Sequence, residues 1–135
     1  MKRPYSYEKR QSGMSLIEVL VSLLIFSFAF LGLIALQARA VQASTDAEDR
    51  SRASLLANEI ISTMWTQKNL SLPPATTAAW EARVRDEAVS GLPGSRGDIS
   101  LPDANGVVTV EIIWRAPFRK VSDQDSRYKT QVTMP

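Results

Sequence analysis

Hydrophobic residues are concentrated in one long run near the beginning of the chain. Residues 16–36 are 21 consecutive positions at which the only charged side chain is Glu18. A helix of this length measures about 31 Å, which is enough to cross the hydrocarbon core of a bilayer. A buried helix of a soluble core is the weaker interpretation, because the remaining sequence has too little apolar surface to surround it. The pattern therefore predicts a membrane-spanning helix.

The helical pattern continues beyond this run without a proline until Pro73. Apolar residues now recur at spacings of three and four, which is the period of an amphipathic helix. We therefore expect one helix over residues 15–67, with residues 37–68 as its amphipathic continuation and Gly32 as its weakest point. The apolar stripe of this continuation consists of Ala53, Leu56, Ala57, Ile60, Ile61 and Met64.

The charged residues that precede this stripe predict a solvated helix face. Asp46 lies four positions before Arg50, and Glu48 lies four positions before Arg52. At this spacing, opposite charges stabilise a helix. Asp49 is assigned to the same solvated face.

A second, shorter helix is predicted after the proline-containing break at residues 69–75. Thr76 or Thr77 can cap this helix, which is expected over residues 78–89. Glycine and proline at residues 91–94 then break it. The buried face of the helix is expected to hold Trp80, Val84 and Ala88.

The last third of the chain alternates between apolar and polar residues, which predicts short antiparallel strands. We expect strands at residues 98–101, 107–114 and 127–134, with a turn at Asn105-Gly106 and a loop over 115–126. The inward face of the second strand would hold Val108, Val110, Ile112 and Trp114, and that of the third Tyr128, Thr130, Val132 and Met134.

Three short strands are not stable alone and need a partner surface. The apolar stripe of the long helix, at Leu56, Ile60 and Met64, supplies one. The predicted fold class is therefore α+β: a long N-terminal helix whose C-terminal half packs on a small antiparallel sheet, plus one short helix. Residues 69–135 form the globular head.

Glu18 is an unusual residue to find near the end of a membrane helix. A carboxylate in that position costs about 2–3 kcal/mol and needs a partner. Glu18 is the fifth residue after Gly13. A cut after Gly13 would give Met14 a new α-amino group, and the amine of one subunit could neutralise Glu18 of its neighbour.

These residues resemble a type IV prepilin cleavage motif, which combines a short basic leader, a glycine, a methylated hydrophobic residue and a glutamate at the fifth place. The resemblance implies that prepilin peptidase removes residues 1–13 by cutting between Gly13 and Met14, and that the Met14 amine is methylated. It also implies storage of residues 14–36 in the membrane, and then assembly into a filament by an inner-membrane platform. Met14 departs from the commoner phenylalanine but is still apolar.

Residues 31–40 and 52–61, followed by Met64, are similar to the type IV pilus modification protein family, PilV, whose members are minor pilins. This resemblance implies a pilin-like fold and a low-abundance subunit of the pilus. Such a subunit helps to initiate pilus assembly together with other minor and major pilins, near the tip. Twitching motility and adhesion are the associated processes.

The charge distribution predicts the orientation in the membrane. The net charge of +2 does not describe the mature chain. The leader holds four basic side chains and one acidic one, which leaves twelve basic and thirteen acidic side chains in the remainder. Basic residues before the apolar run favour a cytoplasmic N-terminus and a periplasmic head, and the resemblance then implies the pilus at the cell surface. A mature net charge of −1 predicts no nucleic-acid partner.

The chain has no cysteine and no histidine. The usual nucleophile, acid–base and zinc constellations are therefore missing, and we predict neither an enzyme nor a cofactor or metal site. Two carboxylate pairs, Asp86-Glu87 and Asp123/Asp125, are interpreted as solvated surface, with calcium binding at the second as the alternative. The absence of a disulfide also weakens an interpretation as the abundant shaft subunit.

Two other functions fit parts of the sequence. A minor pseudopilin of a type II secretion system would share the leader, Glu18, the long helix and the small head. A lone anchored periplasmic binding module would need neither the cut at Gly13 nor a glutamate at that spacing. Whether the loop over residues 115–126 is an interface or only a connection stays open.

Overall fold

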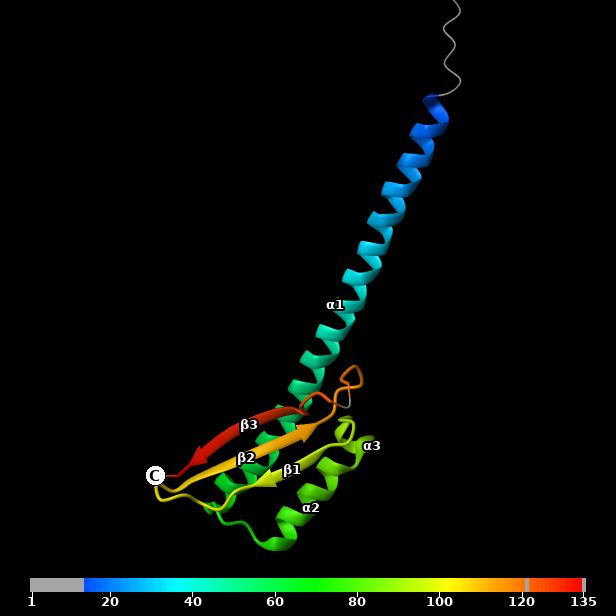
Figure 1. Cartoon of the computed structure of the whole chain (residues 1–135). Coiled ribbons are helices and arrows are strands. Elements are labelled where there is room, and N and C mark those ends of the chain that lie inside the picture. Colours follow the sequence, from blue (N-terminus) through cyan, green and yellow to red (C-terminus); the bar gives the residue numbers. More distant parts are fainter. Residues whose placement is uncertain (1–13, 121, 135) are drawn as a thin grey trace, which may run out of the picture. The chain divides into compact units, whose positions relative to one another are not determined.

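The computed structural model describes residues 14–120 and 122–134. These residues form two compact units, one that ends at Val41 and one that begins at Gln42. The helix α1, Met14–Gln67, contributes to both (Figure 1). The single helix predicted over residues 15–67 is thus confirmed, and it continues through Gly32, at which an added Cβ would meet nothing within 4 Å.

A hydrogen-bonded turn ends α1. Lys68 has a left-handed backbone with φ 48°, its N–H donates to the Trp65 carbonyl, and the Asn69 N–H donates to the Met64 carbonyl at 3.1 Å. Glycine usually occupies this left-handed position of the turn. The paired bonds hold Lys68 there and let the chain leave the helix.

The second helical region differs from the prediction at both ends. Helix α2 is Pro74–Arg85, and α3 is Glu87–Ser90. Pro74 takes the first helical position, where its missing N–H costs nothing, so no threonine cap is needed. Asp86 is extended and accepts a bond from the Ala88 N–H at 3.0 Å, which separates the two helices. Ala88 is exposed, whereas Trp80 and Val84 are buried as predicted.

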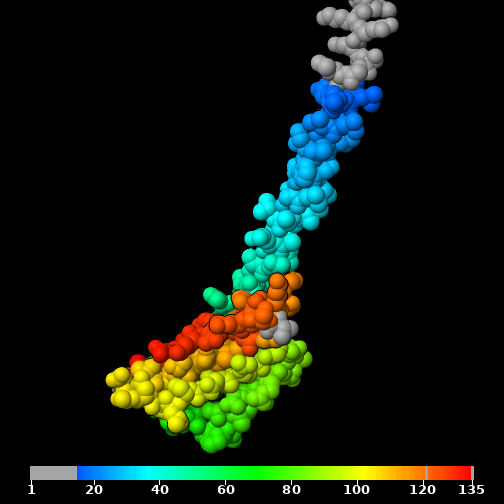
Figure 2. Space-filling view, in the orientation of Figure 1, coloured from blue at the N-terminus to red at the C-terminus, as the bar shows by residue number. Residues whose placement is uncertain are grey.

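The sheet has three antiparallel strands in the order β1-β2-β3. They are β1 Arg96–Ile99, β2 Val107–Trp114 and β3 Ser126–Thr133. The second strand is confirmed at both ends, β3 begins one residue early, and β1 begins two residues early. Figure 2 shows the strands side by side on one face of the head, from yellow through orange to red.

The core of the head lies between α1, α2 and the sheet. The predicted inward face of β2 is confirmed, because its burial alternates strictly along the strand. Ile60 and Met64 of α1 are buried as predicted, and Leu56 is half-buried. The cluster consists of Ala53, Ala57, Ile60, Met64, Trp80, Val84, Leu92, Val108, Val110, Ile112, Trp114 and Val132. The predicted α+β layout is therefore confirmed.

Trp80 connects three elements of this core. Its indole N–H donates to the Leu56 carbonyl of α1 at 2.9 Å. Its ring lies against Gly97 of β1, where an added Cβ would come within 2.6 Å of two ring carbons. Glycine is thus needed at residue 97, because any side chain there would displace the ring.

Of the two ion pairs predicted on α1, one forms. Arg52 bonds to Glu48 at 2.5 Å. No ion pair joins Asp46 to Arg50 in the part of the chain that the structure describes. A further ion pair, Arg83 with Glu59, ties α2 to α1.

Candidate assembly segment and head surfaces

The first part of α1 is a hydrophobic rod with no covering element in its own unit. The large apolar side chains described from Leu16 to Val41 are all exposed, and the most apolar 18-residue window has a mean hydropathy of 2.8 and no buried residue. By length and composition this helix is able to cross a membrane. An apolar surface of this kind needs lipid or other protein around it.

The hydroxyl of Ser27, inside the rod, is satisfied within the helix. The Ser27 hydroxyl donates to the Leu23 carbonyl at 2.7 Å. Such a bond lets a serine face an apolar environment without an unpaired hydroxyl. Phe26 and Phe30 stack one turn apart, with ring centroids 6.3 Å apart.

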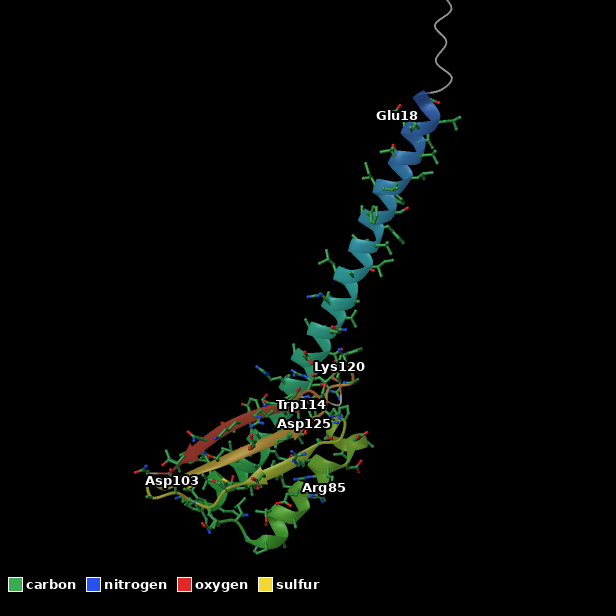
Figure 3. All side chains as sticks on the ribbon, viewed as in Figure 1. Glu18, Arg85, Asp103, Trp114, Lys120 and Asp125 are labelled. Atoms are coloured by element: carbon green, nitrogen blue, oxygen red, sulfur yellow. The ribbon has the colours of Figure 1, made fainter. Side chains whose placement is uncertain are left out.

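The three predicted assembly residues lie at the start of this helix. Gly13 falls outside the described residues, and Met14 is the first residue of α1. Glu18 follows one turn later and is exposed on the helix surface (Figure 3). Within the described chain Glu18 forms no ion pair. The predicted pairing with a neighbour's Met14 amine stays a prediction.

Asp125 was interpreted as solvated surface, but its carboxylate pairs with two arginines. Arg115 donates to Asp125 Oδ1 from Nε at 3.0 Å and from Nη2 at 2.8 Å, and Arg96 lies 3.7 Å from Oδ2. The bond from Arg115 holds the pKa of Asp125 below its usual range. The sequence did not show this because the arginines come from two other segments of the chain.

The remaining predicted surface carboxylates also hold backbone groups. Asp86 caps α3, Glu87 accepts from the Gly94 N–H at 2.6 Å, and Asp123 accepts from the Lys120 N–H at 3.1 Å. Among the described residues no group of three carboxylates is placed to hold a metal ion. These side chains therefore fix turns in the head.

Asp49, which was predicted to be solvated, is buried between α1 and the end of β2, with 6% of its surface exposed. The indole N–H of Trp114 is near enough to lower its pKa, yet neither Asp49 Oδ2 nor Trp114 Nε1 has a hydrogen bond of ordinary geometry within the described chain. Burial dominates and raises the pKa of Asp49. Its place four residues before Ala53, in line with the apolar stripe, was the signal that could have revealed this.

Asp49→Asn is expected to stabilise the head at neutral pH by about 1 kcal/mol, because it removes a buried charge and keeps the polar contact with Trp114. A raised pKa means that the folded carboxyl binds its proton more tightly than the unfolded one. The cost of Asp49 is therefore largest above its folded pKa and disappears below the unfolded value of 3.8. Tryptophan fluorescence during urea unfolding of the micelle-bound chain, at pH 7 and pH 4, measures this.

Asp125→Asn is the matched control, and its expected effect on stability at neutral pH has the opposite sign. Its carboxylate is stabilised in the folded state, so the substitution should lower stability at pH 7, and this effect should fade as the pH drops from 3.8 through the lower folded pKa. Equal shifts for the two variants at pH 7 would contradict both assignments.

One family model matches the chain. Residues 9–34 match the prokaryotic N-terminal methylation motif, which covers the predicted cleavage site, Glu18 and most of the apolar run. No curated protein and no solved structure matches the chain at a significant level. The motif supports a type IV pilin-like or pseudopilin-like protein with a membrane anchor, and suggests processing by prepilin peptidase and association with pilus components.

Proposed function

We propose that this protein is a minor type IV pilin that takes part in the initiation and assembly of the pilus. The observation that best supports this proposal is the uncovered apolar helix, in which Glu18 lies one turn from Met14 inside the matched methylation motif. A lone membrane anchor needs no glutamate at this spacing, whereas a subunit that packs against other apolar helices does.

The proposed mechanism begins at the cytoplasmic end of the helix. Prepilin peptidase cuts between Gly13 and Met14 and the Met14 amine is methylated. The amine is a cation at the depth of Glu18 of an adjacent subunit, so docking pairs two charges that are each costly alone in the membrane. The apolar side chains of residues 16–36 then pack against other pilin helices, and the head supplies the partner-specific contacts.

The more specific assignment is to the PilV family, with a place near the pilus tip beside other minor pilins. The sequence similarity at residues 31–40 and 52–61 supports it. We further propose an inner-membrane subunit with a cytoplasmic N-terminus and a periplasmic head, which then moves to the pilus at the cell surface. Its role is structural rather than enzymatic.

A clean deletion tests the proposal against its rival, a minor pseudopilin of a type II secretion system. Sheared surface pili and secreted enzymes are quantified in the same cultures, with the gene restored in trans as the control. Loss of pili with normal secretion supports the minor pilin. Normal pili with failed secretion would transfer the protein to the pseudopilins, and no change in either would favour a lone anchored module.

A further inference from the structure

The compact unit that begins at Gln42 contains a cleft of about 280 Å³ between α1 and the part of the chain where β2 ends and β3 begins. Asp46, Ala47 and Arg50 line it from α1, and Trp114, Arg119 and Ser126 line it from the other side. All six residues belong to the compact unit that begins at Gln42. In Figure 3, Trp114 and Asp125 lie at this end of the sheet, and Asp103 lies at the other.

Three of the side chains that line the cleft are charged and unpaired. Asp46, Arg50 and Arg119 form no ion pair with any residue that the structure describes. The neighbouring arginines differ, because Arg96 and Arg115 contact Asp125 and Arg127 lies 3.6 Å from Glu111. The cleft therefore offers two guanidinium groups that the fold itself does not use.

The described segment 115–120, which carries Arg119, is anchored at its start. Arg115 bonds to Asp125, and Ala116 is buried. The Arg119 N–H donates to the Ala116 carbonyl at 3.0 Å, which forms a turn. A turn that is already formed loses little conformational entropy when a ligand binds.

The charges in the cleft select the ligand. Arg50 and Arg119 against Asp46 leave one net positive charge, which a single carboxylate would neutralise. The guanidinium fork matches the two oxygens of a carboxylate, and the Ser126 hydroxyl can donate a third bond. Phe118, 55% exposed on the same loop, adds the aromatic surface that is enriched together with arginine in protein interfaces.

We propose that this cleft receives an aspartate or glutamate side chain of a neighbouring subunit, whose carboxylate binds between Arg50 and Arg119. The inference rests on the proposed function, because a filament places other subunits beside the head. It assigns the connection between β2 and β3 to an interface.

The three tryptophans provide a direct test. Sodium acetate is titrated against the full-length chain in neutral micelles at constant ionic strength, with chloride as the balancing anion, and the three indole N–H signals are followed by ¹⁵N NMR. Trp114 lines the cleft, whereas Trp80 is bonded to Leu56 and Trp65 is half-exposed on α1. The Trp114 signal should shift saturably, and the other two should not.

Variants then locate the site. Arg50→Gln and Arg119→Gln should each weaken acetate binding by about tenfold, the value of one charged hydrogen bond, and the double variant should abolish it. Arg85→Gln, an exposed arginine of α2 that does not line the cleft, is the control and should bind acetate normally.

Three outcomes would overturn the proposal. The first is the absence of a selective Trp114 shift, or a shift that the double variant retains. The second is tighter binding of sodium dimethyl phosphate than of acetate, which would assign the cleft to a phospholipid headgroup. The third is normal assembly of pili by the charge-reversed variant Arg50→Glu/Arg119→Glu. Because the titration involves no filament, it can fail while the deletion still removes pili, and the reverse also holds.

Discussion

Glu18→Ala is expected to reduce incorporation of the protein into pili by about tenfold or more. The substitution leaves the Met14 amine of a docking neighbour as an unpaired cation in the membrane, at a cost of about 2–3 kcal/mol. The anchor itself should be retained, since the uncovered apolar helix becomes more hydrophobic. Immunoblots of sheared pili against the membrane fraction measure the ratio.

Two controls separate docking from other steps in this experiment. Intact mass of the membrane-bound protein shows whether residues 1–13 have been removed and the amine methylated, so that a processing defect is recognised. Glu48→Ala removes a glutamate from the same helix, where it pairs with Arg52 at the surface, and should leave incorporation unchanged. Normal incorporation of a processed Glu18→Ala protein would refute the charge-pairing mechanism.

Trp80→Ala is expected to lower the stability of the head by about 3–5 kcal/mol. The ring is fully buried, rests on Gly97 and donates to Leu56, so the substitution leaves a cavity where α1, α2 and β1 meet. The total free energy of unfolding of a small domain is about 5–15 kcal/mol, and here no disulfide offsets the loss. Urea unfolding followed by near-ultraviolet circular dichroism, together with protease sensitivity, measures the loss.

Trp65→Ala is the matched control. Trp65 lies on α1 beside the buried Met64 but is itself 50% exposed, so its removal should change stability by less than about 1 kcal/mol. A second variant, Gly97→Val, should destabilise the head by pushing the Trp80 ring from its place. Similar stabilities for the Trp80 and Trp65 variants would show that the core is centred elsewhere.

The elements that the sequence predicted well depend on local periodicity. The continuous helix follows from an uninterrupted run of helix-forming residues, and β2 follows from the run of mostly β-branched residues between Val107 and Trp114, whose burial then alternates strictly. The membrane segment is a matter of length and composition alone. None of these requires knowledge of which distant segments meet.

The features that the sequence did not predict depend on contacts between segments that are far apart in the chain. In the sequence, Asp49 resembles the other charged residues of a solvated helix face. Its burial depends on β2, whose Trp114 lies beside it in the fold. Asp125 was interpreted as solvated because its partners, Arg96 and Arg115, belong to two other segments of the chain. The cleft combines Arg50 with Arg119, which are far apart in the chain, so neither residue shows it alone.

The bond from Trp80 to the Leu56 carbonyl also has a mechanical meaning. Among the described residues, no backbone hydrogen bond joins α1 to the sheet, so these two are held by interlocked side chains, while this bond and the pair Arg83–Glu59 join α1 to α2. A pull along α1 would load these contacts in shear and all at once, because Ala53 to Met64 belong to one rigid helix. We expect the head to yield abruptly under tension, as a single unit, rather than strand by strand.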